Sequence, residues 1–426
     1  MNIWKNTLDF AIKQDELDPL KSYRKQFHFP SFHEKKMIYY TGNSLGLQPI
    51  STKKYIDQEL NDWAKWGVEG HFHAQRPWMP YHEFITEKAA KIVGGKNNEV
   101  VVTHSLTTNL HLLMVSFYRP TKTRFKILCE KKAFPSDQYA LQSQAKFHGY
   151  QPEEAIVEIG PRDGEYTIRE EDVLAKIEEL GESLAMIMIG GVNYFTGQVF
   201  PMKEITAAGH KVGATVGFDL AHGAGNIPVS LHDWNVDFAA WCGYKYLNSG
   251  PGGSSGLFIH ERHVKNKDLI RFAGWWGHDK NDRFLMPDKF NPIPTAEAWQ
   301  LSNAPVLSMA AHLASLDIFD EVGMNALREK SIQLTNYQEF IINDINERNS
   351  HINLEIITPK DTSKRGCQLS IVAHGQGKSL FEKLSANGVV ADWREPNVIR
   401  IAPVPLYNSF EDAFDFGKII EAAINE

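Results

Sequence analysis

Cysteine is scarce in this sequence, and its spacing argues against the common cysteine-based sites. Cys129, Cys242 and Cys367 lie in or beside predicted strands and form no Cys-x-x-Cys pair. Neither a structural zinc site nor a disulfide framework is therefore indicated. A reducing environment fits this pattern, and we expect a cytoplasmic protein.

Long apolar runs and clusters of basic residues are also missing. The longest apolar stretch, around LAMIMIGGV, covers about half of a membrane span. The N-terminal MNIWKNTLDFAIKQDELD mixes acids into a helical pattern and does not resemble a signal peptide. The formal net charge is −7 and no run of lysine or arginine occurs. We therefore expect neither a membrane nor a nucleic acid as a partner.

The rest of the composition is that of an ordinary globular protein, with 42% apolar and 23% charged residues among 426. From residue 81 to 302, short β-rich runs alternate with helical patterns such as SDQYALQSQAKFHG and EEDVLAKIEELG. This alternation predicts an α/β fold with a mostly parallel sheet covered by helices on both faces. The predicted strands are VVVT, FKILC, AIVEI, LAMIMI, ATVGFD, DFAAW and GLFIH.

A smaller α+β domain is predicted after the large one. A long helical region runs to about residue 349, and INLEII, CQLSIV, VVADW and VIRIAP then read as strands interleaved with helices. We expect three parts. Residues 1–80 form a segment that contributes to the small domain and the site, residues 81–302 form the large domain, and residues 303–426 form a helical connection and the small domain.

One helix is predicted between the N-terminal amphipathic helix and the large domain. Ser51 is expected to cap it, Ile56, Leu60 and Trp63 keep helical spacing along it, and Gly67 ends it.

Two features near this helix have more than one interpretation. His71 and His73 could suggest a metal, but two histidines without a third ligand are typical of a loop, and we expect no metal site. Ser44, in the turn GNSLGLQP, is either a phosphate or substrate donor or a simple turn residue.

The strongest chemical signal lies between residues 218 and 256. Asp219 and His222 follow the predicted strand ATVGFD, and Lys245 follows the next apolar run. In an open α/β sheet, ligands bind at the carboxyl ends of the strands, so the acid and the lysine could meet in one crevice. Such a pair is typical of a pyridoxal phosphate site, where the lysine forms a Schiff base and the acid keeps the pyridine nitrogen protonated. A turn residue at Asp219 and a surface lysine are the alternatives.

Three further positions could serve the same site. Thr107 and Thr108 begin a predicted helix, whose N-terminus could hold a phosphate or be plainly capped. Arg400 lies in an apolar strand, where an arginine is expected to face an anion such as a carboxylate. The turn SGPGGSSG lacks the ending of a nucleotide P-loop, and we expect it to let the backbone pass close to a ligand.

These residues lie in blocks that resemble those of the kynureninases, pyridoxal-phosphate hydrolases of the aminotransferase superfamily with fold type I. The blocks follow the order of the family and cover nearly the whole chain. Together they are highly specific, whereas each alone would be weak. They read GNSLGLQP, WAKWGVEGHFHAQRPW, LTTNLHLLM, FPSDQYALQSQ, GVNYFTGQ, DLAHGAGN, WCGYKYLNSGPGG, GWWGH, LSNAP, RGCQLSI and IRIAPVPLYNSF.

The resemblance implies a role for each matching position. Lys245 resembles the Schiff-base lysine, Asp219 the partner of the pyridine nitrogen, and Tyr244 a tyrosine that reaches the phosphate and relays protons. The other implied cofactor contacts are Leu106, Thr107, Phe134 (stacked on the pyridine ring), Asp137, His222, Trp275 and Asn303. The substrate contacts are Ser44, His71, Asn303 and the carboxylate-binding Arg400.

The resemblance also bears on the oligomeric state and on one position where this sequence differs from part of the family. The family supplies the contacts of Trp275 and Asn303 partly from a second subunit, which implies a homodimer. Gly190 departs from the animal-type members, which have a serine there.

The implied reaction is hydrolysis of the Cβ–Cγ bond of L-kynurenine or 3-hydroxy-L-kynurenine. It gives anthranilate or 3-hydroxyanthranilate and L-alanine, in tryptophan catabolism and NAD biosynthesis. His71, Ser302 and Asn303 resemble the members that prefer the 3-hydroxy substrate. Two alternatives remain: another enzyme of the same fold, either an aminotransferase or a cysteine desulfurase, and a catalytically inactive binding module.

Overall fold

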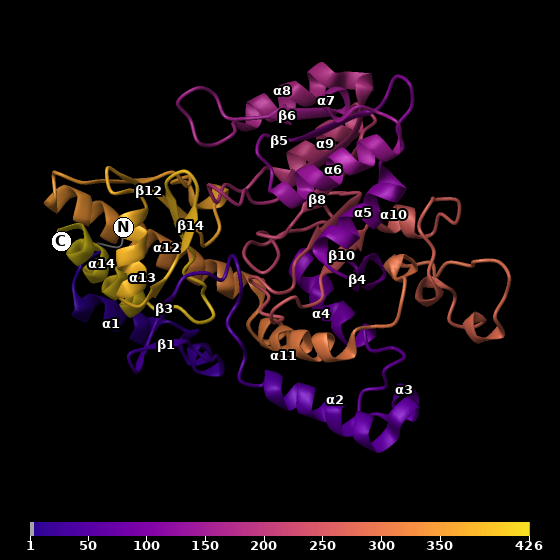
Figure 1. Ribbon diagram of the computed structural model, residues 1–426, viewed down its shortest axis with the longest axis horizontal. Coiled ribbons are helices and arrows are strands. Elements are labelled where there is room, and N and C mark those ends of the chain that lie inside the picture. Colours follow the sequence, from indigo (N-terminus) through magenta and orange to yellow (C-terminus); the bar gives the residue numbers. More distant parts are fainter. Residues whose placement is uncertain (1–3, 426) are drawn as a thin grey trace.

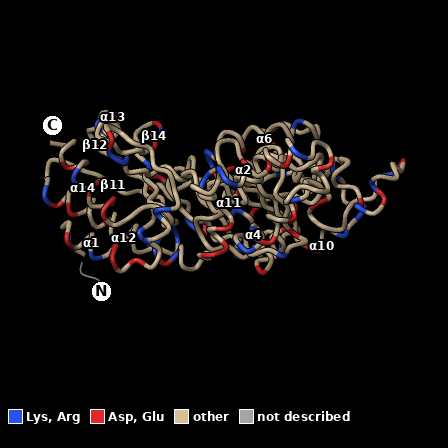
Figure 2. The backbone as a smooth tube through the Cα atoms, turned by 90° about the horizontal axis from the view of Figure 1, so that it is seen from below, with Lys and Arg blue, Asp and Glu red and all other residues tan. Residues whose placement is uncertain are grey.

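The computed structural model describes residues 4–425, so the outermost residues of the predicted first and last segments lie outside the described part. A large α/β part and a smaller α+β part lie side by side along the long axis of the molecule (Figure 1). Lysines and arginines are interspersed with aspartates and glutamates over both parts (Figure 2). Within the described residues, no helix is both long and apolar enough to cross a membrane.

Seven strands form the central sheet of the large part, in the order β4-β10-β9-β8-β7-β5-β6. The strands from β6 to β9 pair in parallel, whereas β10 runs antiparallel to both of its neighbours. The predicted α/β fold with a mostly parallel sheet is thereby confirmed. The strands are β4 (Val100–Val102), β5 (Lys126–Glu130), β6 (Ile156–Ile159), β7 (Leu184–Gly190), β8 (Thr215–Asp219), β9 (Phe238–Trp241) and β10 (Gly256–Ile259).

Helices cover both faces of this sheet, so its strands are buried on both sides. Successive side chains of a strand point to opposite faces. Ile187 and Ile189 of β7 therefore join one hydrophobic core, while Met186 and Met188 join the other. The helices of this part are α4 (Glu83–Val93), α5 (Leu106–Phe117), α6 (Pro135–Phe147), α7 (Pro152–Ala155), α8 (Glu170–Leu180), α9 (Met202–Lys211) and α10 (Glu261–Val264).

The helical region that follows is divided by Gly323 into α11 (Val306–Val322) and α12 (Met324–Arg348). Gly323 has a φ of 76°, which glycine adopts without strain. The buried side chains of α11 belong to the core of the large part, and those of α12 belong mainly to the core of the small part. The division of the chain at residues 80 and 302 stays a prediction.

The small part is built on an antiparallel sheet in the order β11-β12-β15-β14. The predicted last helix is confirmed as α14, with its apolar face buried and Ser409 Oγ accepting from the N–H of Asp412 at 3.1 Å. The elements are β11 (Asn353–Ile356), β12 (Leu369–His374), α13 (Gly377–Ala386), β13 (Val389–Val390), β14 (Asp392–Arg394), β15 (Val398–Ile401) and α14 (Phe410–Asn425).

The N-terminal segment contacts both parts. Helix α1 packs on α14, β3 pairs in parallel with β13, and α2 packs along α11 in the large part. The segment therefore connects the two parts. Its elements are α1 (Leu8–Leu17), β1 (Ser31–Phe32), β2 (Lys35–Lys36), β3 (Ile38–Tyr39), α2 (Thr52–Trp66) and α3 (Gly70–His73).

Helix α2 has the predicted length, but its buried residues differ from the apolar positions noted in the sequence. Trp63 is 61% exposed, whereas Glu59 is 1% exposed. Glu59 is buried because it accepts hydrogen bonds from Trp78 Nε1 at 3.0 Å and Tyr81 Oη at 2.9 Å. Ser51 occupies the N-cap position, but its side chain forms no capping hydrogen bond.

Candidate active site

A cavity of about 280 Å³ opens at the carboxyl ends of β5, β7 and β8, between the two parts of the molecule. Most of the site residues predicted from the sequence line it, although they come from distant segments. It is lined by Asn43, Ser44, Ser105, Leu106, Thr107, Glu130, Phe134, Ser136, Asp137, Gly190, Val192, Tyr194, Asp219, Ala221, His222, Tyr244, Lys245, Arg394 and Arg400.

Lys245 lies in the centre of the predicted cofactor contacts. Its Nζ is 3.1 Å from His222 Nε2 and 5.8 Å from the centroid of the Phe134 ring. Burial, and then the charge of Lys245, lower the pKa of His222 well below its ordinary value. The neutral imidazole therefore accepts a hydrogen bond from the lysine amine and holds it in the pocket.

Two aspartates face each other beside this lysine. Asp219 ends β8, and its Oδ1 accepts from the backbone N–H of Ala221 at 2.7 Å. Burial raises the pKa of Asp219, and burial together with the charge of Asp219 raises the pKa of Asp137 well above the usual range. Because two carboxylates so placed cannot both ionise easily, Asp137 keeps its proton and donates a hydrogen bond to Asp219.

Two helices begin at the pocket wall. Leu106 and Thr107 are the first residues of α5, and Ser136 and Asp137 are in the first turn of α6. The hydroxyls of Thr107 and Ser136 lie 2.6 Å apart, which joins the two helix ends. The unpaired N–H groups of a helix N-terminus favour an anion, so α5 offers the expected phosphate position.

Arginines from the small part form the opposite wall. Arg400 of β15 is 1% exposed and donates through Nη1 to the backbone oxygen of Tyr194 at 2.6 Å and through Nη2 to Asp392. Arg394 Nη2 lies 3.1 Å from the same carboxylate. Two arginines share one aspartate, so one positive charge remains for an anionic group.

The turn that carries Ser44 is fixed against the lysine loop. The N–H of Gly46 donates to the backbone oxygen of Tyr244 at 2.9 Å. A Cβ on Gly46 would lie 2.4 Å from the backbone oxygen of Lys245, so this close approach requires glycine. Burial raises the pKa of Tyr244, whose hydroxyl therefore keeps its proton at neutral pH.

The residues present fit pyridoxal phosphate. Asp137 Oδ1 and His222 Nδ1 are buried in the pocket and lack a hydrogen-bond partner within the described residues. Unpaired buried polar atoms are costly, which indicates that a polar ligand completes the pocket. Lys245 offers an amine, Asp219 a buried carboxyl group, and Phe134 an aromatic face for a planar ring.

Three predicted site residues do not line this pocket. Trp275 is 43% exposed and its Nε1 donates to the backbone oxygen of Arg283 at 3.3 Å. Asn303 is exposed before α11. His71 belongs to the short helix α3, not to a loop, and its Nδ1 is 2.9 Å from the backbone oxygen of Val68. The role of His71 stays a prediction, as do those of Trp275 and Asn303, for which the resemblance implies a contribution from a second subunit.

The turn SGPGGSSG, expected to approach a ligand, is also absent from the lining of this pocket. Its Ser254 packs against α11, where the backbone N–H donates to Ser308 Oγ at 3.0 Å.

Sequence reasoning missed several residues that line the pocket. Glu130 ends an apolar strand exactly as Asp219 does, so the signal that identified Asp219 was present for Glu130 as well. Arg394 precedes Arg400 by six residues on the neighbouring strand. Tyr194 lies in the quoted block GVNYFTGQ, and its ring packs edge-on against Phe134 with centroids 5.4 Å apart.

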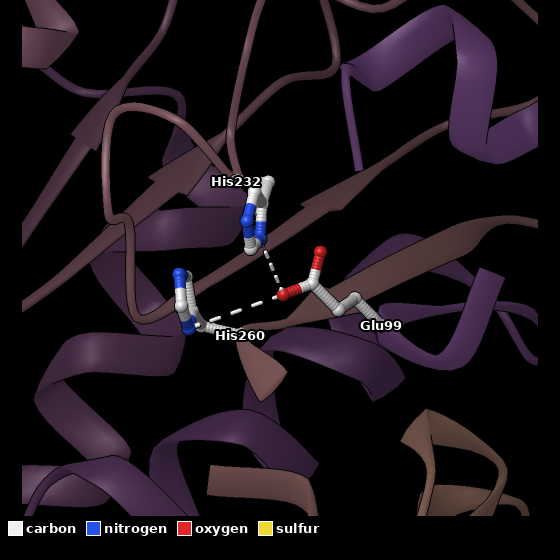
Figure 3. A group of neighbouring side chains, drawn as sticks. All are labelled: Glu99, His232 and His260. Atoms are coloured by element: carbon white, nitrogen blue, oxygen red, sulfur yellow. Dashed lines mark hydrogen bonds and ion pairs between the residues drawn. The ribbon is translucent and has the colours of Figure 1, made fainter. Parts of the chain in front are cut away.

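Figure 3 shows a second group of titratable side chains, Glu99, His232 and His260, and none of them lines this pocket. Glu99 is fully buried and accepts from His232 Nδ1 at 2.9 Å, from the N–H of Glu261 at 2.7 Å and from the N–H of Lys96 at 2.8 Å. The nearby His260 Nδ1 accepts from a backbone N–H at 3.2 Å. Each of these potential ligand atoms already has a hydrogen-bond partner, so the group joins chain segments.

Comparison with solved structures supports the fold. A cysteine desulfurase from Escherichia coli is similar with a TM-score of 0.76 and 17% identity, over 95% of this chain and 98% of that chain. A C-DES variant with glycine covalently linked to the PLP cofactor is similar with a TM-score of 0.75 and 18% identity, over 93% and 98%. The predicted fold type I is confirmed by these likenesses.

Comparison with known sequences identifies the family. The family model of the kynureninase C-terminal domain matches residues 327–420. A kynureninase from Flavobacterium psychrophilum is 59% identical over 100% of both chains, and one from Flavobacterium johnsoniae is 59% identical over 99% of both. With such identity over its whole length, the chain belongs to the kynureninase family.

Proposed function

We propose that this chain hydrolyses the Cβ–Cγ bond of L-kynurenine or 3-hydroxy-L-kynurenine, with pyridoxal phosphate as cofactor, and releases L-alanine and the corresponding anthranilate. Its membership of the kynureninase family supports this reaction. The observation that carries the assignment of roles is the meeting of Lys245, Asp219 and Arg400 in one pocket.

Pyridoxal phosphate, when bound, supplies a carbonyl that links to an amine and a ring that withdraws electrons from the bonds next to that amine. Lys245 holds the cofactor and, once released by the substrate amine, takes and returns protons. Asp219 holds the proton of the pyridine nitrogen. Tyr244 would donate a hydrogen bond to the phosphate and relay protons, and the N-terminus of α5 would bind the phosphate.

The arginine wall orients the substrate. The Nε atoms of Arg400 and Arg394 are buried and lack a partner within the described residues. An arginine binds a carboxylate through paired N–H groups, so these atoms can receive the α-carboxylate of the substrate. The aryl group then lies away from the small part, on the side where the second subunit is proposed to contribute.

A homodimer is part of this proposal. Large apolar patches on a protein surface mark interaction sites. The segments that hold the predicted second-subunit contacts expose such side chains: Trp63, Val68, Phe72, Trp275, Phe284, Leu285, Met286 and Leu307. Burial of these residues against a second copy would bring Trp275 and Asn303 near a partner's pocket.

The cysteines do not support the desulfurase alternative. A desulfurase needs a reactive thiolate on a mobile loop, but all three cysteines are buried. Burial raises the pKa of Cys242 to about 11 and that of Cys367 to about 12, so both stay protonated at neutral pH. The same unpaired cysteines support a cytoplasmic location as part of the proposal.

The direct test is to incubate the purified chain and pyridoxal phosphate with L-kynurenine and to measure anthranilate fluorescence and L-alanine. We expect both products in equal amounts, and none from the Lys245→Ala variant. Lys53→Ala, a change of an exposed lysine, is the matched control. Alanine release from cysteine but not from kynurenine would replace the proposed function with the desulfurase reaction.

A further inference from the structure

Glu130 is a buried acid of the pocket to which the reaction above gives no role. It is 4% exposed and ends β5, two strands away from Asp219 at the end of β8. Gly190 ends the strand between them and pairs with Asp219. Because glycine has no side chain, the carboxyl group of Glu130 lies against this position, where the charge of Asp219 acts on it.

The carboxyl group of Glu130 packs closely against Gly190. Both carboxyl oxygens of Glu130 lie 3.2 Å from the N–H of Gly190, which donates to them. A Cβ added to Gly190 would lie 3.0 Å from Glu130 Oε1, at the limit of tolerated contact. Gly190, which has no Cβ, therefore leaves room for the glutamate.

The groups that face Glu130 do not neutralise it. They are the carboxyl groups of Asp219 and Asp137 and the hydroxyl of Tyr194. Within the described residues, no cationic side chain forms an ion pair with it, and its backbone donors are the N–H groups of Gly190 and of Glu130 itself. Burial raises the pKa of Glu130 to about 7, and the charge of Asp219 adds to this effect.

We propose that Glu130 is a positioning residue that assists Asp219, and that its carboxyl group adds a second negative charge to the pyridine end of the cofactor site as the pH rises above neutrality. With Asp137 protonated, Asp219 is the one carboxylate of this trio that is ionised at lower pH. The ionisation of Glu130 then strengthens the hold on the pyridine proton under the alkaline conditions in which that proton would otherwise be lost. This inference rests on the proposed function.

The variant Glu130→Gln tests the charge, because glutamine keeps the size and can still accept from Gly190. The absorbance of the bound cofactor is titrated from pH 6 to pH 9, since its spectrum reports the protonation of the cofactor and of its link to Lys245. We expect the midpoint to fall by about one pH unit, a tenfold change in proton affinity. Glu158→Gln, on the exposed side of the neighbouring strand β6, should leave the midpoint unchanged.

A second variant separates charge from shape. Glu130→Asp keeps a carboxyl group and should restore the midpoint at least partly toward that of the wild type. Equal midpoints in the wild type and the glutamine variant, or a shift in the aspartate variant as large as that in the glutamine variant, would overturn the inference. In either case a wild type with a normal cofactor spectrum would leave the proposed function intact, whereas a wild type that binds no cofactor would contradict the proposed function itself.

Discussion

The cofactor-free chain provides an independent prediction about Glu130, because an acid with a raised pKa makes stability depend on pH. The pKa of Glu130 is raised from 4.5 to about 7. Between these values the folded chain still holds a proton that the unfolded chain has lost, so the free energy of unfolding falls as the pH rises. The full loss is reached above the folded pKa and amounts to about 3 kcal/mol at roughly 1.4 kcal/mol per pH unit.

A glutamine side chain does not ionise, so the Glu130→Gln variant should not show this fall in the free energy of unfolding. At pH 8.5 we expect the cofactor-free variant to be more stable than the wild type by up to about 3 kcal/mol. For a chain of 426 residues this corresponds to a melting temperature about 3 °C higher. At pH 5, just above the pKa of 4.5 of the unfolded chain, most of this loss has not yet occurred, so the advantage should fall to about 1 kcal/mol.

The measurement is thermal unfolding of both chains without cofactor at the two pH values, followed by circular dichroism. Glu158→Gln serves as the control, since Glu158 is an exposed carboxylate on the adjacent strand. A difference between variant and wild type that is the same at pH 5 and pH 8.5 would refute the reasoning, because only ionisation of Glu130 makes the difference depend on pH.

The remaining predictions concern the reaction. Lys245→Ala should abolish turnover, because no other amine of residues 4–425 lines the pocket; a steady-state assay that finds wild-type activity would contradict this. Asp219→Ala should reduce both cofactor affinity and kcat, and normal values of both would exclude its role. Arg400→Ala should raise KM by about 10- to 100-fold through loss of a charged hydrogen bond, and an unchanged KM would exclude it as the carboxylate clamp. The wild type should have a higher kcat/KM for 3-hydroxykynurenine than for kynurenine, and apolar replacements of His71 or Asn303 should lower that ratio; equal values in the wild type would contradict this.

The sequence indicated which residues meet in the pocket, because the predicted chemistry coincides with strand ends. Asp219 and Lys245 each follow an apolar run, and the parallel pairing of β8 with β9 brings these ends together. Arg400 was recognised for a related reason, since a cation within an apolar strand needs an anion. In each case a local pattern was sufficient, because the geometry of a parallel sheet supplies the long-range contact.

Other features depend on contacts that a local pattern does not contain. The burial of Glu59 follows from hydrogen bonds to Trp78 and Tyr81, about twenty residues away, and not from the apolar spacing along α2. Trp63, on that same helix, is exposed in the single chain. The proposed homodimer would cover this side of α2 as well, and a helix covered on two sides has no simple division into one apolar and one polar face.

The pocket lies between the two parts of the molecule, and its acids and its arginines come from different parts. The acids Glu130, Asp137 and Asp219 come from the large part, whereas Arg394 and Arg400 come from the small part. Arg400 of the small part donates to the backbone oxygen of Tyr194, which belongs to the large part. In the proposed function, a substrate with a carboxylate at one end would bind in one direction, with its amine toward Lys245 and the acids. Because this polarity depends on the contact at Tyr194, a change that displaces the small part should weaken substrate orientation before it affects the hold of Asp219 on the cofactor.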